Sequence, residues 1–185
     1  MLRAVVRTTA LALVLCGAAF AADSAGAWLD VPFVRQSKEG CGAASIAMVM
    51  QYWQRQLGQP ASSSADAERI LRALYSSAAH GIYNTDMVRY FQQHGYRTFA
   101  FPGQWADLEQ HLARGRPLIV GLRPYADNAL HYVVVTGIDP RQQLVLLNDP
   151  AQRKLLKEDR ATFEQEWKVT GYWTLLAVPQ PSTPH

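Results

Sequence analysis

The chain has 185 residues, of which 49% are hydrophobic and 10% aromatic, and it carries a net charge of +3 at pH 7. This length and apolar content suit one well-cored domain and exclude two domains of ordinary size. The small net charge does not indicate nucleic acid as a partner.

The first 22 residues are predicted to be a secretory signal peptide. Arg3 and Arg7 form a basic start, an apolar run follows, and residues 19–21 read Ala-Phe-Ala, a small-x-small cleavage pattern. The apolar run is shorter than the roughly 20 residues that span a bilayer, so no stable membrane anchor is expected. Removal of the segment lowers the net charge to +1 and leaves Cys41 as the single cysteine. We therefore expect an exported protein, either periplasmic or secreted.

Residues 23–178 are predicted to form one α+β domain, and residues 179–185, with three prolines, a disordered tail. Apolar residues at helical spacing predict helices at 41–56, at 65–75, from a cap at Asn84 or Thr85 to Gly95, at 105–113 and at 159–167. Extended segments are predicted at 29–34, 96–101, 116–122, 131–138, 144–147, around Leu155 and at 172–178. We expect N-terminal helices packed on a mostly antiparallel sheet, because helices come first and a hairpin joins two of the later strands.

A cysteine stands where a polar, glycine-flanked turn meets the first predicted helix. Cys41 lies between Gly40 and Gly42. Unpartnered backbone amides and the helix dipole favour the thiolate, the nucleophilic form, at such a position. The two glycines leave room for a substrate backbone. The side-chain amide of Gln36, five residues upstream, could complete an oxyanion hole with the backbone N–H at the helix start.

A thiol nucleophile requires a base, and the base requires an orienting group. His131 opens a predicted strand, which gives its side chain a fixed direction. Asp149 follows the next strand and precedes Pro150, so its carboxylate can hold the second ring nitrogen. Asn148 is an alternative orienting group.

Each of these four residues also has a structural interpretation. Cys41 could be a core thiol, His131 a hydrogen-bonded residue at a strand end, Asp149 a turn former and Gln36 an exposed loop residue. No combination of His, Cys and carboxylate residues has metal-ligand spacing, so neither a metal nor a cofactor is predicted.

Four ordered motifs resemble the papain-like cysteine peptidases, and more narrowly the bacteriocin-processing, double-glycine-leader peptidases of family C39. The motifs are Val31-Pro32-Phe33-Val34-Arg35-Gln36, Gly40-Cys41-Gly42-Ala43-Ala44, His131-Tyr132-Val133-Val134-Val135-Thr136-Gly137 and Asn148-Asp149-Pro150. The resemblance implies the papain-like fold, with Cys41 as nucleophile, His131 as base, Asp149 as orienting group and Gln36 as oxyanion donor.

The predicted function is an exported, monomeric cysteine peptidase that cleaves a polypeptide substrate. A bacterial export or surface-fibre system is a candidate partner. Two alternatives use the same residues: a catalytically silent module that binds peptides, and an amidase of cell-wall peptides.

Overall fold

The computed structural model describes residues 26–124 and 129–181 of the chain. The predicted signal peptide at 1–22 and residues 182–185 of the predicted tail lie outside this part. The described helical elements are α1 (Cys41–Gln56), the short 3-10 helix η1 (Ser63–Ala65), α2 (Ala67–Leu74), α3 (Asn84–Gln93), α4 (Trp105–Ala113) and α5 (Arg160–Val169). The described strands are β1 (Ala27–Trp28), β2 (Tyr96–Pro102), β3 (Leu118–Leu122), β4 (His131–Asp139), β5 (Leu144–Asn148), β6 (Leu156–Asp159) and β7 (Trp173–Pro179).

The seven described strands form one antiparallel sheet in the order β2-β7-β3-β4-β5-β6, with β1 paired to β4 outside this path. Strand β4 lies between β3 and β5, so its first residue, His131, pairs with Leu122 of β3. At the other side, Val134 of β4 pairs with Asn148, the last residue of β5. This register brings the start of β4 and the end of β5 to the same end of the sheet.

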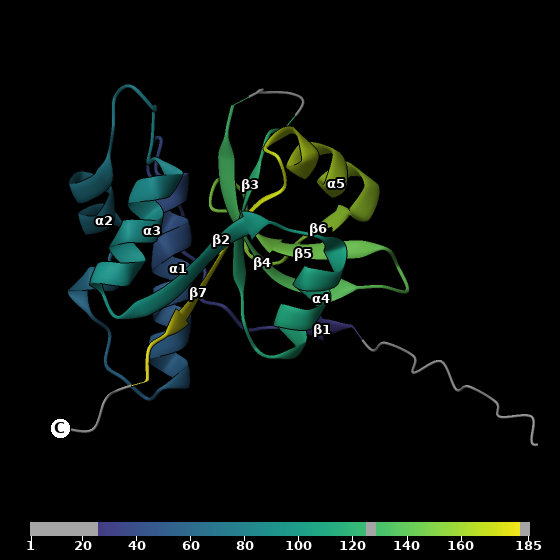
Figure 1. Ribbon diagram of the computed structural model, residues 1–185, viewed down its shortest axis with the longest axis horizontal. Coiled ribbons are helices and arrows are strands. Elements are labelled where there is room, and N and C mark those ends of the chain that lie inside the picture. Colours follow the sequence, from purple (N-terminus) through teal and green to yellow (C-terminus); the bar gives the residue numbers. More distant parts are fainter. Residues whose placement is uncertain (1–25, 125–128, 182–185) are drawn as a thin grey trace, which may run out of the picture.

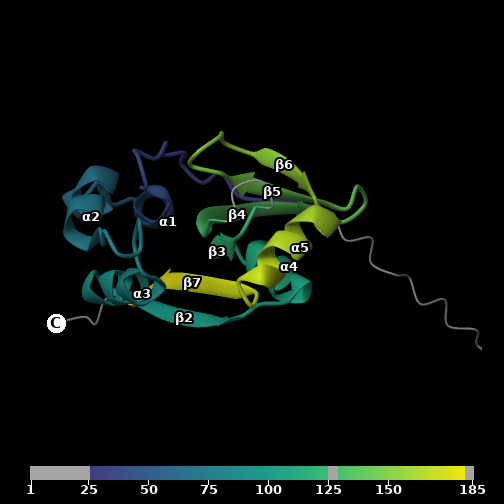
Figure 2. The ribbon, with the colours of Figure 1, turned by 90° about the horizontal axis from the view of Figure 1, so that it is seen from above.

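Each face of the sheet is covered by its own group of helices. Successive side chains of β4 point to opposite faces of the sheet, and both sets are buried. Tyr132 and Val134 pack in a core cluster with α1 and α3, whereas Val133 and Val135 pack in a second cluster with α4 and α5. Figures 1 and 2 show α1, α2 and α3 grouped at one side of the sheet and α4 and α5 at the other. The α+β architecture predicted from the sequence is confirmed.

Helix α1 packs closely on the sheet because its contact face is built from small and apolar residues. Ala43, Ala44 and Ala47 are buried, and the hydroxyl of Ser45 donates a hydrogen bond of 3.2 Å to the carbonyl of Tyr132. This bond ties the first turn of α1 to the start of β4. The first residue of α1 is Cys41, so the same contact places the cysteine beside the His131 end of β4.

Several element boundaries differ from the prediction. Residues 29–34, predicted to be a short extended or edge segment, bond to β4 through the Leu29 N–H and the Thr136 carbonyl, and the side-chain amide of Asn148 donates to the carbonyls of Val31 and Pro32. Asn84 is the first residue of α3 rather than its cap, since Tyr83 holds the cap position. The last strand extends to Pro179, and the Gln180 N–H donates to Gly95, so the start of the predicted tail belongs to the fold.

In the part of the chain that the structure describes, no helix has the length and apolar character needed to cross a membrane.

Candidate active site

The N-terminus of α1 presents Cys41 as a free, partly buried thiol. The residue before it, Gly40, offers no side chain to cap the helix, so first-turn amides keep unused hydrogen-bonding capacity. A Cβ at position 40 would lie 3.0 Å from the carbonyl oxygen of Ser37, so a side chain there would crowd the tight turn before the helix. A Cβ at Gly42 would approach Ile82 to 3.2 Å. The glycines therefore let the chain turn tightly and pack closely around the thiol.

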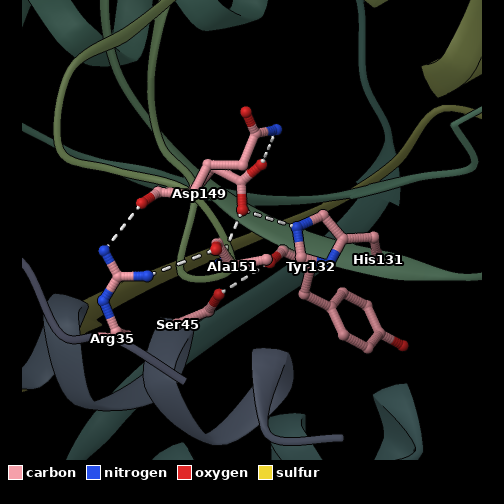
Figure 3. Close-up of polar contacts among 7 residues, drawn as sticks. Arg35, Ser45, His131, Tyr132, Asp149 and Ala151 are labelled. Atoms are coloured by element: carbon pink, nitrogen blue, oxygen red, sulfur yellow. Dashed lines mark hydrogen bonds and ion pairs between the residues drawn. The ribbon is translucent and has the colours of Figure 1, made fainter. Parts of the chain in front are cut away.

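His131 and Asp149 form a hydrogen-bonded ion pair at the meeting point of β4 and β5. Nε2 of His131 lies 2.8 Å from Oδ1 of Asp149, and their side chains are 18% and 6% exposed. Figure 3 shows this contact, with the carboxylate between the ring of His131 and Ala151. An ionised carboxylate only accepts hydrogen bonds, so Nε2 carries a proton. The other ring nitrogen, Nδ1, is left to exchange a proton with Cys41.

The environment of His131 keeps its ring charged at neutral pH. Burial alone lowers the pKa of His131, but the hydrogen bonds with Asp149 and Cys41, and the charges of both, raise it to about 9. Burial raises the pKa of Asp149, but His131, the Ala151 N–H and Gln152 outweigh it, so the net pKa is lowered. A protonated imidazole beside a thiol stabilises the thiolate, which makes the pair suited to nucleophilic attack.

The loop after Asp149 holds its carboxylate at both oxygens. The Ala151 N–H donates to Oδ1 at 2.8 Å and the Gln152 side chain donates to Oδ2 at 2.7 Å. The guanidinium of Arg35 donates to the carbonyls of Ala151 and Gln152, at 3.5 and 3.1 Å. The segment that leads to Cys41 thereby braces the loop that orients Asp149.

Asn148, the alternative orienting group, points elsewhere. Its side chain is fully buried, donates to the carbonyls of Val31 and Pro32, and accepts from the Leu155 N–H at 3.1 Å. Of the two adjacent side chains, Asp149 is the one that contacts His131.

Gln36 lies next to the Asp149 loop. Its backbone N–H donates to the Pro150 carbonyl at 3.0 Å. Its side-chain Oε1 is buried and finds no hydrogen-bond partner among the described residues. An unsatisfied buried carbonyl oxygen is uncommon and costs stability, but it is an acceptor, so the donor that an oxyanion requires would be the Nε2 group of the same side chain.

Three positioning residues escaped the sequence prediction. Gln152 stands three residues after Asp149, a spacing at which a turn can return a side chain to the carboxylate. Ser45 is a polar residue in an apolar helix, which is itself a signal of a specific buried contact. Arg35 carries no comparable signal, because its partners are backbone carbonyls more than 100 positions away.

Among residues 26–124 and 129–181, no three His, Cys, Asp or Glu side chains are grouped in a way that could hold a metal ion.

Residues 28–175 match the Peptidase C39-like family. The chain therefore belongs to this family of cysteine peptidases, in agreement with the resemblance of its four motifs. No curated protein matches the chain.

Solved structures share the fold at low sequence identity. A double glycine motif protease from an AMS/PCAT transporter, crystallised with the leader peptide, is 21% identical, with a TM-score of 0.62 over 83% of this chain and 95% of that chain. A putative C39-like peptidase from Bacillus anthracis is 19% identical, with a TM-score of 0.64 and coverage of 84% and 98%. The peptidase domain of Streptococcus ComA is 22% identical, with a TM-score of 0.59 and coverage of 80% and 98%.

Proposed function

We propose that the protein is an exported cysteine peptidase in which Cys41, His131 and Asp149 act as a triad and Gln36 supports the oxyanion. The observation that carries the proposal is the His131–Asp149 pair, at 2.8 Å, beside a free thiol at the start of α1. Family membership supports the chemistry, because the Peptidase C39-like family consists of cysteine peptidases.

The first half of the reaction forms a thioester. The Cys41 thiolate attacks the carbonyl carbon of the scissile peptide, and the negative charge that develops on oxygen meets the Gln36 amide and the backbone N–H at the helix start. The carbon–nitrogen bond then breaks, and protonated His131 gives its proton to the leaving amine.

The second half regenerates the enzyme. His131, now neutral, takes a proton from water, and the resulting hydroxide attacks the thioester carbon. The carbon–sulfur bond breaks, the carboxylic acid product leaves, and the sulfur returns as thiolate beside protonated His131. Asp149 holds the ring in one orientation throughout, because its two oxygens are fixed by the following loop.

The proposed substrate is a polypeptide in the periplasm or outside the cell. The structurally similar protease from the AMS/PCAT transporter was crystallised with a leader peptide, which supports a peptide substrate for this chain. The basic start, apolar run and small-x-small pattern of residues 1–22 support export. Fractionation of cells that express the full chain tests the location, with recovery in the cytosol as the contrary result.

The test of catalysis compares the wild-type protein with Cys41→Ala on a peptide mixture prepared from a whole proteome, with mass spectrometry of the products. New termini should appear with the wild type and disappear completely with Cys41→Ala, while circular dichroism of the two proteins stays the same. His131→Ala should also lose cleavage, whereas His94→Ala, at the end of α3, should keep it. Cleavage by Cys41→Ala at the wild-type rate would overturn the mechanism.

A further inference from the structure

A pocket opens on the face of the sheet that α1 covers, beside the candidate active site. Its volume is about 190 Å³, and it is lined by Asn84, Arg123, Leu130, Tyr132, Thr170 and Trp173. Pockets that enclose a whole small molecule measure roughly 300–1,000 Å³. The smaller space is suited to one side chain of a longer chain that continues into solvent.

The pocket adjoins the proposed nucleophile through Tyr132. This residue follows His131 on β4, and its side chain lies on the other face of the strand, as Figure 3 shows. A Cβ on Gly42, the neighbour of Cys41, would lie 3.5 Å from the Tyr132 ring. The pKa of Tyr132 is raised by burial and, in part, by the nearby Cys41. A peptide held at Cys41 can therefore place a neighbouring side chain against Tyr132.

The pocket combines aromatic walls with the guanidinium side chain of an arginine. Tyr132 and Trp173 supply aromatic walls, and their rings pack edge to face at 5.3 Å between centroids. The Nε of Arg123 is buried and has no hydrogen-bond acceptor in the described part of the chain. Thr170 is not available to a ligand as a donor, since its hydroxyl already contacts the carbonyls of Gly121 and Trp167 at 2.7 and 2.8 Å.

A carboxylate is the group that best complements this arrangement. A guanidinium presents several N–H donors in a planar fork that matches the two oxygens of a carboxylate. With no acceptor among the described residues, the buried Nε–H carries a free-energy cost that an incoming acceptor recovers. The backbone N–H of Arg123 donates to the Glu166 carbonyl at 3.2 Å, which holds the start of the side chain in place.

We propose that this pocket receives an acidic side chain of the polypeptide substrate, with its carboxylate on Arg123 and its methylene groups against Tyr132 and Trp173. The inference rests on the proposed peptidase function for the identity of the ligand, and it adds a specificity: an aspartate or glutamate near the cleaved bond.

Binding is tested first, without turnover, in the Cys41→Ala protein. The blocked tripeptides alanyl-glutamyl-alanine amide and alanyl-glutaminyl-alanine amide are titrated while the indole N–H resonance of Trp173, assigned with Trp173→Phe, is followed by NMR. The glutamate peptide should bind about tenfold more tightly than the glutamine peptide, as expected for a charge-assisted hydrogen bond in a partly open pocket. Arg123→Gln should abolish the difference, and Arg123→Lys should keep part of it. Arg97→Gln, the same change on an exposed arginine of β2, should leave it intact.

Cleavage-site profiling of the proteome-derived peptides provides the second readout. Acidic residues should be enriched at one position relative to the cut for the wild type and for Arg97→Gln, but not for Arg123→Gln. Equal binding of the two peptides, no shift with either peptide, or a selectivity that survives Arg123→Gln would overturn the pocket assignment. Cleavage without enrichment of acidic residues would also overturn the pocket assignment, but it would still support the peptidase function. Selective binding without any cleavage above the Cys41→Ala level would reject the peptidase and keep the acidic pocket.

Discussion

At the scale of single residues, Gln36 is the member of the proposed site whose side chain is least committed to the fold. Its backbone is fixed by the Pro150 carbonyl, yet its buried Oε1 has no partner within the described residues. A side chain with a structural role would satisfy such an atom. In the proposed mechanism the oxyanion is met by the Nε2 amide group of Gln36, which is a donor, whereas Oε1 can only accept a hydrogen bond.

We expect Gln36→Ala to lower kcat by about 10²–10³-fold, the usual effect of removing one oxyanion donor. The free energy of unfolding should change little, because no side-chain hydrogen bond of Gln36 within the described residues is lost. Steady-state kinetics and urea unfolding measure the two quantities. Gln59→Ala, in the loop after α1, is a control that should leave both unchanged. An unaltered kcat in Gln36→Ala would remove this residue from the mechanism.

At the scale of elements, the end of β5 divides two tasks between adjacent residues. Asn148 faces the core and holds Val31, Pro32 and Leu155, whereas Asp149 leaves the strand and turns to His131. Neighbouring side chains of one strand end therefore hold the core and, in the proposed mechanism, orient His131.

Separate substitutions of Asn148 and Asp149 should affect stability and activity differently. Asn148→Ala leaves buried backbone groups without partners and should lower the free energy of unfolding by about 2–4 kcal/mol, as measured in urea. Asp149→Asn is nearly isosteric and should have a smaller effect on stability, but it should lower kcat by about 10²–10⁴-fold, because the orientation and charge of His131 depend on the carboxylate. If kcat, corrected for the fraction of folded protein, falls further in Asn148→Ala than in Asp149→Asn, then Asn148 rather than Asp149 supports the reaction.

At the scale of the whole molecule, carboxylates accumulate around β6 and α5. Burial, together with the charges of Glu166, Asp149 and Asp159, raises the pKa of Glu158 from 4.5 to about 7. A carboxyl group whose pKa is higher in the folded than in the unfolded state contributes most to stability below pH 4.5. That contribution declines as the pH rises to about 7.

Glu158→Gln should therefore stabilise the protein at alkaline but not at acidic pH. We expect its free energy of unfolding to exceed that of the wild type by on the order of 1–3 kcal/mol at pH 8, and to equal it near pH 4.5. Urea unfolding at the two pH values measures the difference. Glu68→Gln, on the exposed side of α2, should show no such pH dependence. An equal effect of Glu158→Gln at both pH values would contradict the electrostatic origin.

Local sequence patterns predicted most elements because each is encoded within its own segment. The span of α4 agrees with the prediction, and α1 begins at Cys41 as expected, since apolar spacing and flanking glycines act locally. Residues 29–34, predicted to be a short extended or edge segment, form no strand, because Asn148 takes the carbonyls of Val31 and Pro32. That contact joins positions 117 residues apart, so no local pattern reports it.

The sequence by itself determined the α+β class and the four candidate residues, because glycine placement, periodicity and strand ends are local properties of the chain. Only the tertiary structure decided that Asp149 rather than Asn148 meets His131, and that Arg123 lines a pocket where its Nε has no acceptor among the described residues. Those outcomes depend on the directions of adjacent side chains and on the distant groups that they contact. Strand register and helix packing determine both the directions and the contacts.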